Sequence, residues 1–131
     1  MQAMRELNRG IVDYLCRYVT DHVNSSDMTL KHVASVLQIP YRTASAAFRK
    51  ATGVKFGDFV NSTRTARAAI LLEGTSLPIK AIANEVGFSA VPNFYRAFKR
   101  IRGTTPACHR QISAGARGQA AQGDYAPPYQ H

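Results

Sequence analysis

Two short segments of the sequence each combine closely spaced cations with apolar residues at helical spacing. The cations are Arg42, Arg49 and Lys50 in the first segment and Arg96, Lys99 and Arg100 in the second. An arginine can direct two parallel N–H groups at the O6 and N7 atoms of guanine, whereas a lysine suits phosphate oxygens as a point charge. These residue types predict binding of a polyanion, with some cations able to distinguish bases.

The overall charge favours the same class of partner. The chain has 17 Lys and Arg against 8 Asp and Glu, a net charge of +9 and a pI near 10.1, which favours nucleic acid through counterion release. An anionic membrane surface is the second candidate. However, the longest apolar run, residues 68–72, is too short to span a membrane, and the N-terminus lacks the apolar stretch of a secretory signal. No membrane association is expected, and the cytosol is the expected location.

Catalytic and metal-binding motifs are missing from the sequence. It contains no nucleophile elbow, phosphate-binding loop, H-E-x-x-H or paired-carboxylate pattern, which disfavours an enzyme. The histidines and cysteines show no close-spaced ligand pattern, so we expect neither a metal nor a cofactor. Cys16 and Cys108 are predicted to be reduced, buried side chains.

Helical periodicity predicts the elements that must position the cations. Apolar residues recur every three or four positions over residues 7–23, which indicates an amphipathic helix. A short helix capped by Thr29 follows, and a third helix over residues 41–51 ends at Gly53. Residues 56–72 contain no proline and predict a longer helix.

The second half of the chain predicts three more helices and a tail. Pro78 marks the start of a fifth helix, where its missing N–H costs nothing. A sixth helix is expected after a Ser89 cap, with Pro92 in its first turn, and a short seventh over residues 105–112. Residues 114–131 are rich in Gly, Ala, Gln and Pro, and are predicted to be a disordered tail.

An internal repeat relates the two halves. Leu30, Val33, Ala34, Leu37 and Ile39 recur 49 residues later as Ile79, Ile82, Ala83, Val86 and Phe88, and Ala44, Phe48, Arg49, Lys50 and Gly53 recur 50 residues later as Phe94, Phe98, Lys99, Arg100 and Gly103. Because apolar, basic and glycine positions keep register, we infer a duplicated helix-turn-helix. The predicted fold is all-α with about seven helices. Two homeodomain-like helix-turn-helix subdomains, residues 7–54 and 75–113, are joined by a connecting helix at residues 55–74.

The second unit carries a recognisable motif. Residues 79–89, 94–100 and 103–106 resemble the signature of the AraC/XylS family of bacterial regulators, and the likeness covers about residues 8–112. In the connecting helix, the family's spacing is matched by Arg64, Ala68, Leu71 and Leu72. The resemblance implies a transcription regulator whose two recognition helices enter successive major-groove segments. A connecting helix of about 25 Å, together with its flanking residues, is long enough to hold the two recognition helices near the expected separation of about 34 Å, which is one turn of DNA.

The sequence departs from the family pattern at two places. The family favours an aromatic residue before its closing arginine, whereas this chain has His109 before Arg110. The first recognition helix also has unusually small residues at Ala44, Ala46 and Ala47.

The outward faces of both recognition helices are predicted to contact double-stranded DNA. They present Arg42, Thr43, Ser45, Ala46, Arg49 and Lys50 in the first unit and Val91, Pro92, Tyr95, Arg96, Lys99 and Arg100 in the second. Arg42 and above all Arg96 are expected to read bases, and the cations nearer the helix ends to bind phosphate. Arg64 lies on the apolar stripe of the connecting helix and is interpreted as a structural residue.

Two questions stay open in the sequence. The same scaffold can act mainly through protein contact, with RNA polymerase or another regulator as partner, and a steep salt dependence of duplex binding would instead favour DNA. The chain is either a stand-alone protein, expected to bind DNA as a monomer, or a fragment of a larger regulator with a sensor domain. The operator and the direction of regulation are not encoded in these patterns.

Overall fold

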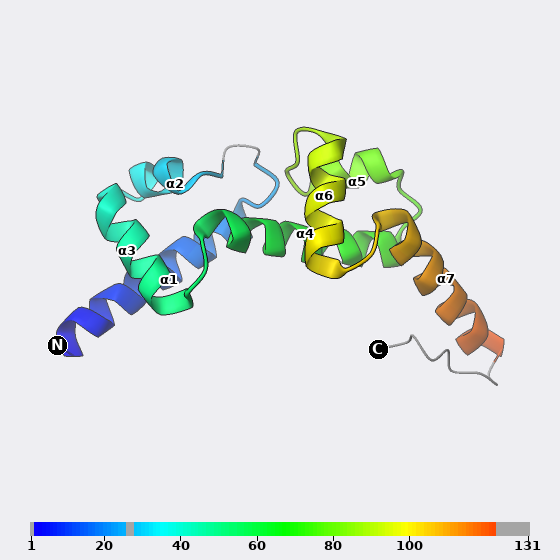
Figure 1. Ribbon diagram of the computed structural model, residues 1–131, viewed down its shortest axis with the longest axis horizontal. Coiled ribbons are helices and arrows are strands. Elements are labelled where there is room, and N and C mark those ends of the chain that lie inside the picture. Colours follow the sequence, from blue (N-terminus) through cyan, green and yellow to red (C-terminus); the bar gives the residue numbers. More distant parts are fainter. Residues whose placement is uncertain (1, 26–27, 123–131) are drawn as a thin grey trace. The chain divides into compact units, whose positions relative to one another are not determined.

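The computed structural model describes residues 2–25 and 28–122, which form seven α-helices and no β-strand (Figure 1). The helices are α1 (Gln2–Asp21), α2 (Leu30–Val36), α3 (Tyr41–Thr52), α4 (Phe56–Gly74), α5 (Ile79–Glu85), α6 (Val91–Arg102) and α7 (Pro106–Gln122). The chain divides into two compact units, Met1–Arg64 and Thr65–His131, and α4 continues from the first into the second. The predicted all-α fold is confirmed. Within the described part of the chain, no helix is long and apolar enough to cross a membrane.

The first helix starts and ends earlier than predicted. α1 begins at Gln2 rather than near residue 7, because the preceding residues are good helix formers and include neither proline nor glycine. It ends at Asp21, and residues 22–24 form a turn. The apolar stripe that predicted a helix to Val23 therefore extends beyond the helix itself, and Val23 is buried from the turn.

Helices α2 and α3 form the first helix-turn-helix. The predicted cap is confirmed, since the His32 N–H donates a hydrogen bond to Thr29 Oγ1 at 3.2 Å. The turn between the helices contains Gln38 in the left-handed conformation, with φ 59°, and α3 ends at Gly53 with φ 73°. Gln38 corresponds to Gly87 in the repeat, where φ is 102°. The sequence marks only the second of these two equivalent turns with a glycine.

The core of the first unit is built mostly from the helix faces that the periodicity predicted, but Leu7 and Tyr14, which belong to the apolar pattern of residues 7–23, are exposed. Its buried residues include Leu15, Val19, Val33, Ala34, Phe48 and Val60. The Phe48 ring meets Phe56 and Phe59 edge-on, with ring centroids 5.4 Å and 5.6 Å apart. These ring contacts hold α3 against the start of α4, so the opposite side of α3 is left to solvent.

Helices α5 and α6 repeat this arrangement, with one correction at the start of α6. The predicted Ser89 cap is wrong: the N-cap residue is Ala90, which makes no side-chain capping hydrogen bond. Pro92 lies in the first turn as predicted, and because proline has no N–H, it leaves one donor fewer to cap. The helix ends at Gly103 with φ 82°, as α3 ends at Gly53.

The second unit has its own core. Its buried residues include Ala68, Ala69 and Leu72 of α4, Ile82 and Ala83 of α5, and Phe94 and Phe98 of α6. The rings of Phe94 and Phe98 lie one helical turn apart, with centroids separated by 5.7 Å. They fix the buried side of α6, as Phe48 fixes that of α3.

The last helix is longer than predicted. α7 was expected to end at Ile112 but continues to Gln122. Residues 114–122 are mainly Ala, Gln and Arg, whose high helix propensity outweighs that of two glycines in this stretch. The first part of the predicted tail is thus helical, and residues 123–131 lie outside the described residues.

Candidate nucleic-acid interface

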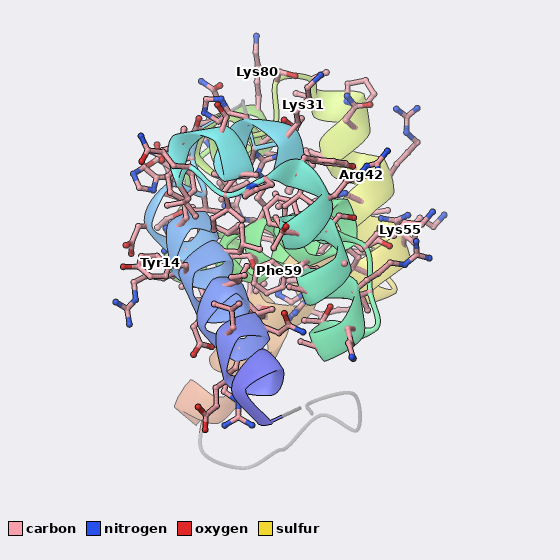
Figure 2. The ribbon with its side chains drawn as sticks, turned by 90° about the vertical axis from the view of Figure 1, so that its left-hand side faces the viewer. Tyr14, Lys31, Arg42, Lys55, Phe59 and Lys80 are labelled. Atoms are coloured by element: carbon pink, nitrogen blue, oxygen red, sulfur yellow. The ribbon has the colours of Figure 1, made fainter. Side chains whose placement is uncertain are left out.

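The third helix presents a short cationic face on the side away from the core. Ala44, Ala47 and Phe48 are buried, whereas Arg42, Thr43, Ala46, Arg49 and Lys50 are exposed. Ser45 is half-buried and lines a hollow of about 430 Å³ together with Phe48 and Phe56. In Figure 2, Arg42 lies at the start of α3, on the other side of the unit from Tyr14 of α1. Of the predicted contact residues in α3, only Ser45 is partly withdrawn from the surface.

The sixth helix presents the corresponding face in the second unit. Phe94, Ala97 and Phe98 are buried, whereas Pro92, Arg96, Lys99 and Arg100 are exposed. Val91 and Tyr95 are half-buried and pack against the second core. The Tyr95 ring meets Phe94 edge-on, with centroids 6.2 Å apart. Val91 and Tyr95 thus offer only part of their surface to a partner, and cations dominate the face.

Neither face has acidic residues close to it in the sequence. No Asp or Glu occurs from residue 28 to 57 or from residue 86 to 123, and these spans contain α2, α3 and α6. Within each unit, the exposed cations therefore create a positive field on the face of the recognition helix instead of being neutralised by neighbours along the chain. Such a field attracts phosphates, and salt weakens the attraction.

Arg96 makes a contact that the sequence analysis missed. Its Nη2 donates a hydrogen bond to Oδ1 of Asn93, which lies one turn earlier on the exposed face of α6. The three-residue spacing that allows such a contact is visible in the sequence. Asn93 is neither charged nor apolar, however, so neither the charge pattern nor the periodicity selected it.

Two lysines were also missed, although the repeat marks them. Lys31 and Lys80 are separated by the same 49 residues as the apolar positions of α2 and α5. Each is the second residue of its helix, and both are exposed; Figure 2 labels them. The repeat therefore extends to cations outside the recognition helices.

Two other arginines are held within their own units. Arg64 is only 8% exposed; its Nε donates to the Val23 carbonyl at 3.2 Å and its Nη2 to the Ser25 carbonyl at 2.6 Å. Burial lowers the pKa of its guanidinium. In the second unit, Arg110 Nε donates to the Leu72 carbonyl at 3.2 Å. The structural interpretation of Arg64 is confirmed, and Arg110 acts in the same way on the end of α4.

His109 occupies the place where the resemblance predicts an aromatic residue. Its ring packs edge-on against Phe98 of α6, with centroids 5.6 Å apart. Its Nε2 lies 2.8 Å from Oε2 of Glu73, near the end of α4. The imidazole therefore supplies an aromatic surface and links α7 to both α4 and α6.

The cysteines differ in their environments. Cys16 is half-buried, and burial together with the nearby Asp13 carboxylate raises the pKa of its thiol. Cys108 is exposed, so the prediction that both are buried is wrong for this residue. The buried residue of this turn is Pro106, and a residue two positions later points to the other side of the helix. Among the residues the structure describes, no three His, Cys, Asp or Glu side chains form a potential metal site.

Comparison with known proteins identifies the family. The family described as "Helix-turn-helix domain" matches residues 33–112. The arabinose operon regulatory protein of Escherichia coli (strain K12) is 30% identical over 91 residues, which are 70% of this chain and 31% of that protein. The C-terminal domain of AraT, a response regulator from Geobacillus stearothermophilus, is 33% identical with a TM-score of 0.75, over 78% of this chain and 84% of that domain. The chain belongs to the AraC-type helix-turn-helix family.

The AraC-type family is one of transcription regulators and not of enzymes. Its members are often much longer: an uncharacterized HTH-type transcriptional regulator of Bacillus subtilis (strain 168), YtdP, is 32% identical over 72% of this chain, which is 12% of that protein. The chain spans 12% to 32% of the curated relatives that it matches. The DNA-binding domain of AdpA, solved in complex with a target DNA, shares the AraC-type fold at 22% identity, with a TM-score of 0.76 over 82% of this chain and 96% of that domain.

Proposed function

We propose that this AraC-type domain binds double-stranded DNA sequence-specifically and thereby regulates transcription. In this proposal the exposed faces of α3 and α6 enter successive segments of the major groove, which is about 12 Å wide and admits an α-helix. The observation that carries the proposal is the duplicated cationic face. In each unit, phenylalanines bury one side of the recognition helix, and exposed cations occupy the other.

The position of each cation along its helix supports a division of roles. Arg42 is the second residue of α3, and Arg96 lies in the first half of α6; helix-turn-helix proteins bring the early residues of the recognition helix to the base edges. Arg49 and Lys99 lie near the ends of their helices, where phosphates flank the groove. We assign base reading to the first two residues and phosphate binding to the latter two, together with their neighbours Lys50 and Arg100.

The connecting helix supports binding at two places. α4 passes from one unit into the other, and its 19 residues correspond to about 28 Å of helix. This length is comparable with the separation of about 34 Å between adjacent major-groove segments on one face of DNA. The AdpA domain, which has the same fold, was solved with a target DNA. We therefore expect two short DNA motifs, one for each unit.

The proposal also covers the stoichiometry on DNA, the location of the protein and a second partner. We propose that the domain, where it stands alone, binds an asymmetric site as a monomer. Its proposed site of action is the bacterial chromosome in the cytoplasm, and RNA polymerase is its proposed second partner. Any sensing function would reside in a separate domain, since curated relatives are several times longer than this chain.

Selection of bound duplexes from a random pool tests the proposal. We expect two short motifs about one helical turn apart. The selected duplex should bind at least about 1000-fold more tightly than a random duplex, and affinity for both should fall as salt rises. Recovery of no motif, with equal affinity for both duplexes, would overturn the proposal. Binding of RNA polymerase without binding of duplex would instead favour the protein-contact alternative.

A further inference from the structure

We propose that Asn93 is a positioning residue that holds the Arg96 guanidinium in the orientation needed to read a guanine. This inference rests on the proposed function and names a determinant of its sequence specificity. Asn93 belongs to none of the charged or apolar patterns in the sequence, and its contact with Arg96 is visible only in the structure.

The two side chains share the exposed face in the first half of α6. Asn93 is the third residue of the helix and Arg96 the sixth, so they lie on adjacent turns. Arg96 Nη2 donates to Asn93 Oδ1, and both residues are exposed. The hydrogen bond therefore orients a side chain that is otherwise exposed to solvent.

The chemistry of the pair restricts what each side chain can recognise. A guanidinium has five N–H groups, so one bond to Asn93 leaves enough donors for the O6 and N7 atoms of guanine. An asparagine recognises adenine with both its oxygen and its NH₂ group. The oxygen of Asn93 uses one of its two lone pairs to accept from Arg96, so this bond turns the Asn93 amide toward the guanidinium. We therefore assign Asn93 to the support of Arg96, and the experiment below distinguishes this role from independent recognition of adenine.

The first unit has no equivalent pair. With the 50-residue offset, Asn93 and Arg96 correspond to Thr43 and Ala46, and a methyl group cannot accept or donate a hydrogen bond. This particular pair therefore occurs at the recognition helix of the second unit and not at the equivalent positions of the first. Asn84 provides a matched control, because it is an exposed asparagine of the same unit that lies on α5 and not on the recognition helix.

The decisive experiment compares Asn93→Ala, Arg96→Ala and the double variant on three DNAs. These are the selected duplex, the same duplex with the Arg96-dependent guanine replaced, and a random duplex. Asn93→Ala should lower the preference for guanine by about 3- to 10-fold, the effect of one ordinary hydrogen bond, and leave random-duplex binding unchanged. Within the Arg96→Ala background, the same substitution should cause no further loss. Asn84→Ala should leave the guanine preference unchanged.

A conservative variant separates positioning from a general structural effect. Asn93→Asp keeps an acceptor for Arg96 and should retain the guanine preference, although its negative charge should weaken binding to every duplex. The inference is overturned if Asn93→Ala leaves the preference intact, changes only an adenine position, or has the same effect with and without Arg96. Absence of any base preference in the wild-type protein would overturn the proposed function as well, so the two failures are distinguishable.

Discussion

The arginine side chains of this domain occupy two kinds of environment. Arg64 donates to a backbone carbonyl in the turn after α1, and Arg110 donates to one near the end of α4. Arg42 and Arg96 are exposed on the recognition helices, on the side away from the buried phenylalanines. Because the guanidinium remains charged and offers several donors, the same residue type stabilises the fold in the first pair and is available to a partner in the second.

Substitution of Arg96 should have a different effect from substitution of Lys99. Arg96→Ala is expected to weaken binding to the selected duplex by about 1–3 kcal/mol and to relax one base position, whereas Lys99→Ala should weaken binding to all sequences similarly. The reason is that a base contact distinguishes sequences and a phosphate contact does not. Titrations with selected and random duplexes measure both effects. Equal losses on the two duplexes for both variants would contradict the assigned roles.

Arg64 should matter for stability and not for DNA recognition. Arg64→Met keeps the apolar stem but removes the hydrogen bonds to the Val23 and Ser25 carbonyls. We expect the free energy of unfolding to fall by about 2–4 kcal/mol, since bonds from a charged group are among the stronger ones. Chemical denaturation followed by circular dichroism provides the measurement. Arg42→Met is the control: Arg42 is exposed, and the change in stability should stay within about 0.5 kcal/mol.

At the scale of the helices, substitution at the two left-handed turns of the first unit is expected to change the free energy of unfolding in opposite directions. Gln38 has φ 59° and an exposed side chain, so Gln38→Gly should raise the free energy of unfolding by about 0.5–1 kcal/mol. This gain is the backbone strain that glycine relieves minus the conformational entropy that glycine adds to the unfolded chain. Gly53 has φ 73°, and a Cβ there would meet no other atom within 4 Å. Gly53→Ala should therefore lower stability by about 1 kcal/mol through backbone strain alone. Thermal or denaturant unfolding of both variants tests the pair, and two shifts of the same sign would contradict it.

The helices and their buried faces could be predicted because they depend on periodicity. The helical spacing predicted that Ala44 and Phe48 point inward in α3, and that Phe94 and Phe98 point inward in α6. The structure confirms this prediction. The ends of the helices were harder to predict from the sequence. Ala90 starts α6 without any side-chain cap, and α7 continues beyond Ile112 because helix propensity persists where the apolar pattern stops.

The finer features of the site depend on side-chain size and direction, which spacing alone does not determine. Tyr95 was assigned to the outward face, yet its ring also packs against Phe94, because a long aromatic side chain can reach the core from a flanking position. Asn93 carried no charge that would have drawn attention to it. Its contact with Arg96 depends on the direction of the two side chains, which only the structure shows.

At the scale of the whole chain, two separate cores support two equivalent cationic faces. Each core consists mainly of residues from one unit of the repeat, and α4 contributes to both. Neither unit needs the other's side chains to form the buried side of its recognition helix. Duplication thus provides two similar binding elements within one chain, and their joint effect on affinity depends on the DNA presenting both motifs at a suitable spacing.

The spacing between the two DNA motifs therefore offers the most direct test of joint binding. Insertion of about 5 base pairs between them turns the second motif to the opposite face of the duplex, since one helical turn is about 10–10.5 base pairs. We expect affinity to fall to that of a duplex with a single motif, a loss on the order of 100-fold or more when two linked contacts become one. Titration of the original, inserted and single-motif duplexes measures this loss. The double variant Arg96→Ala with Lys99→Ala, which impairs the second unit without touching its core, should respond far less to the insertion. Unchanged affinity of the wild-type protein after the insertion would mean that only one recognition helix binds DNA.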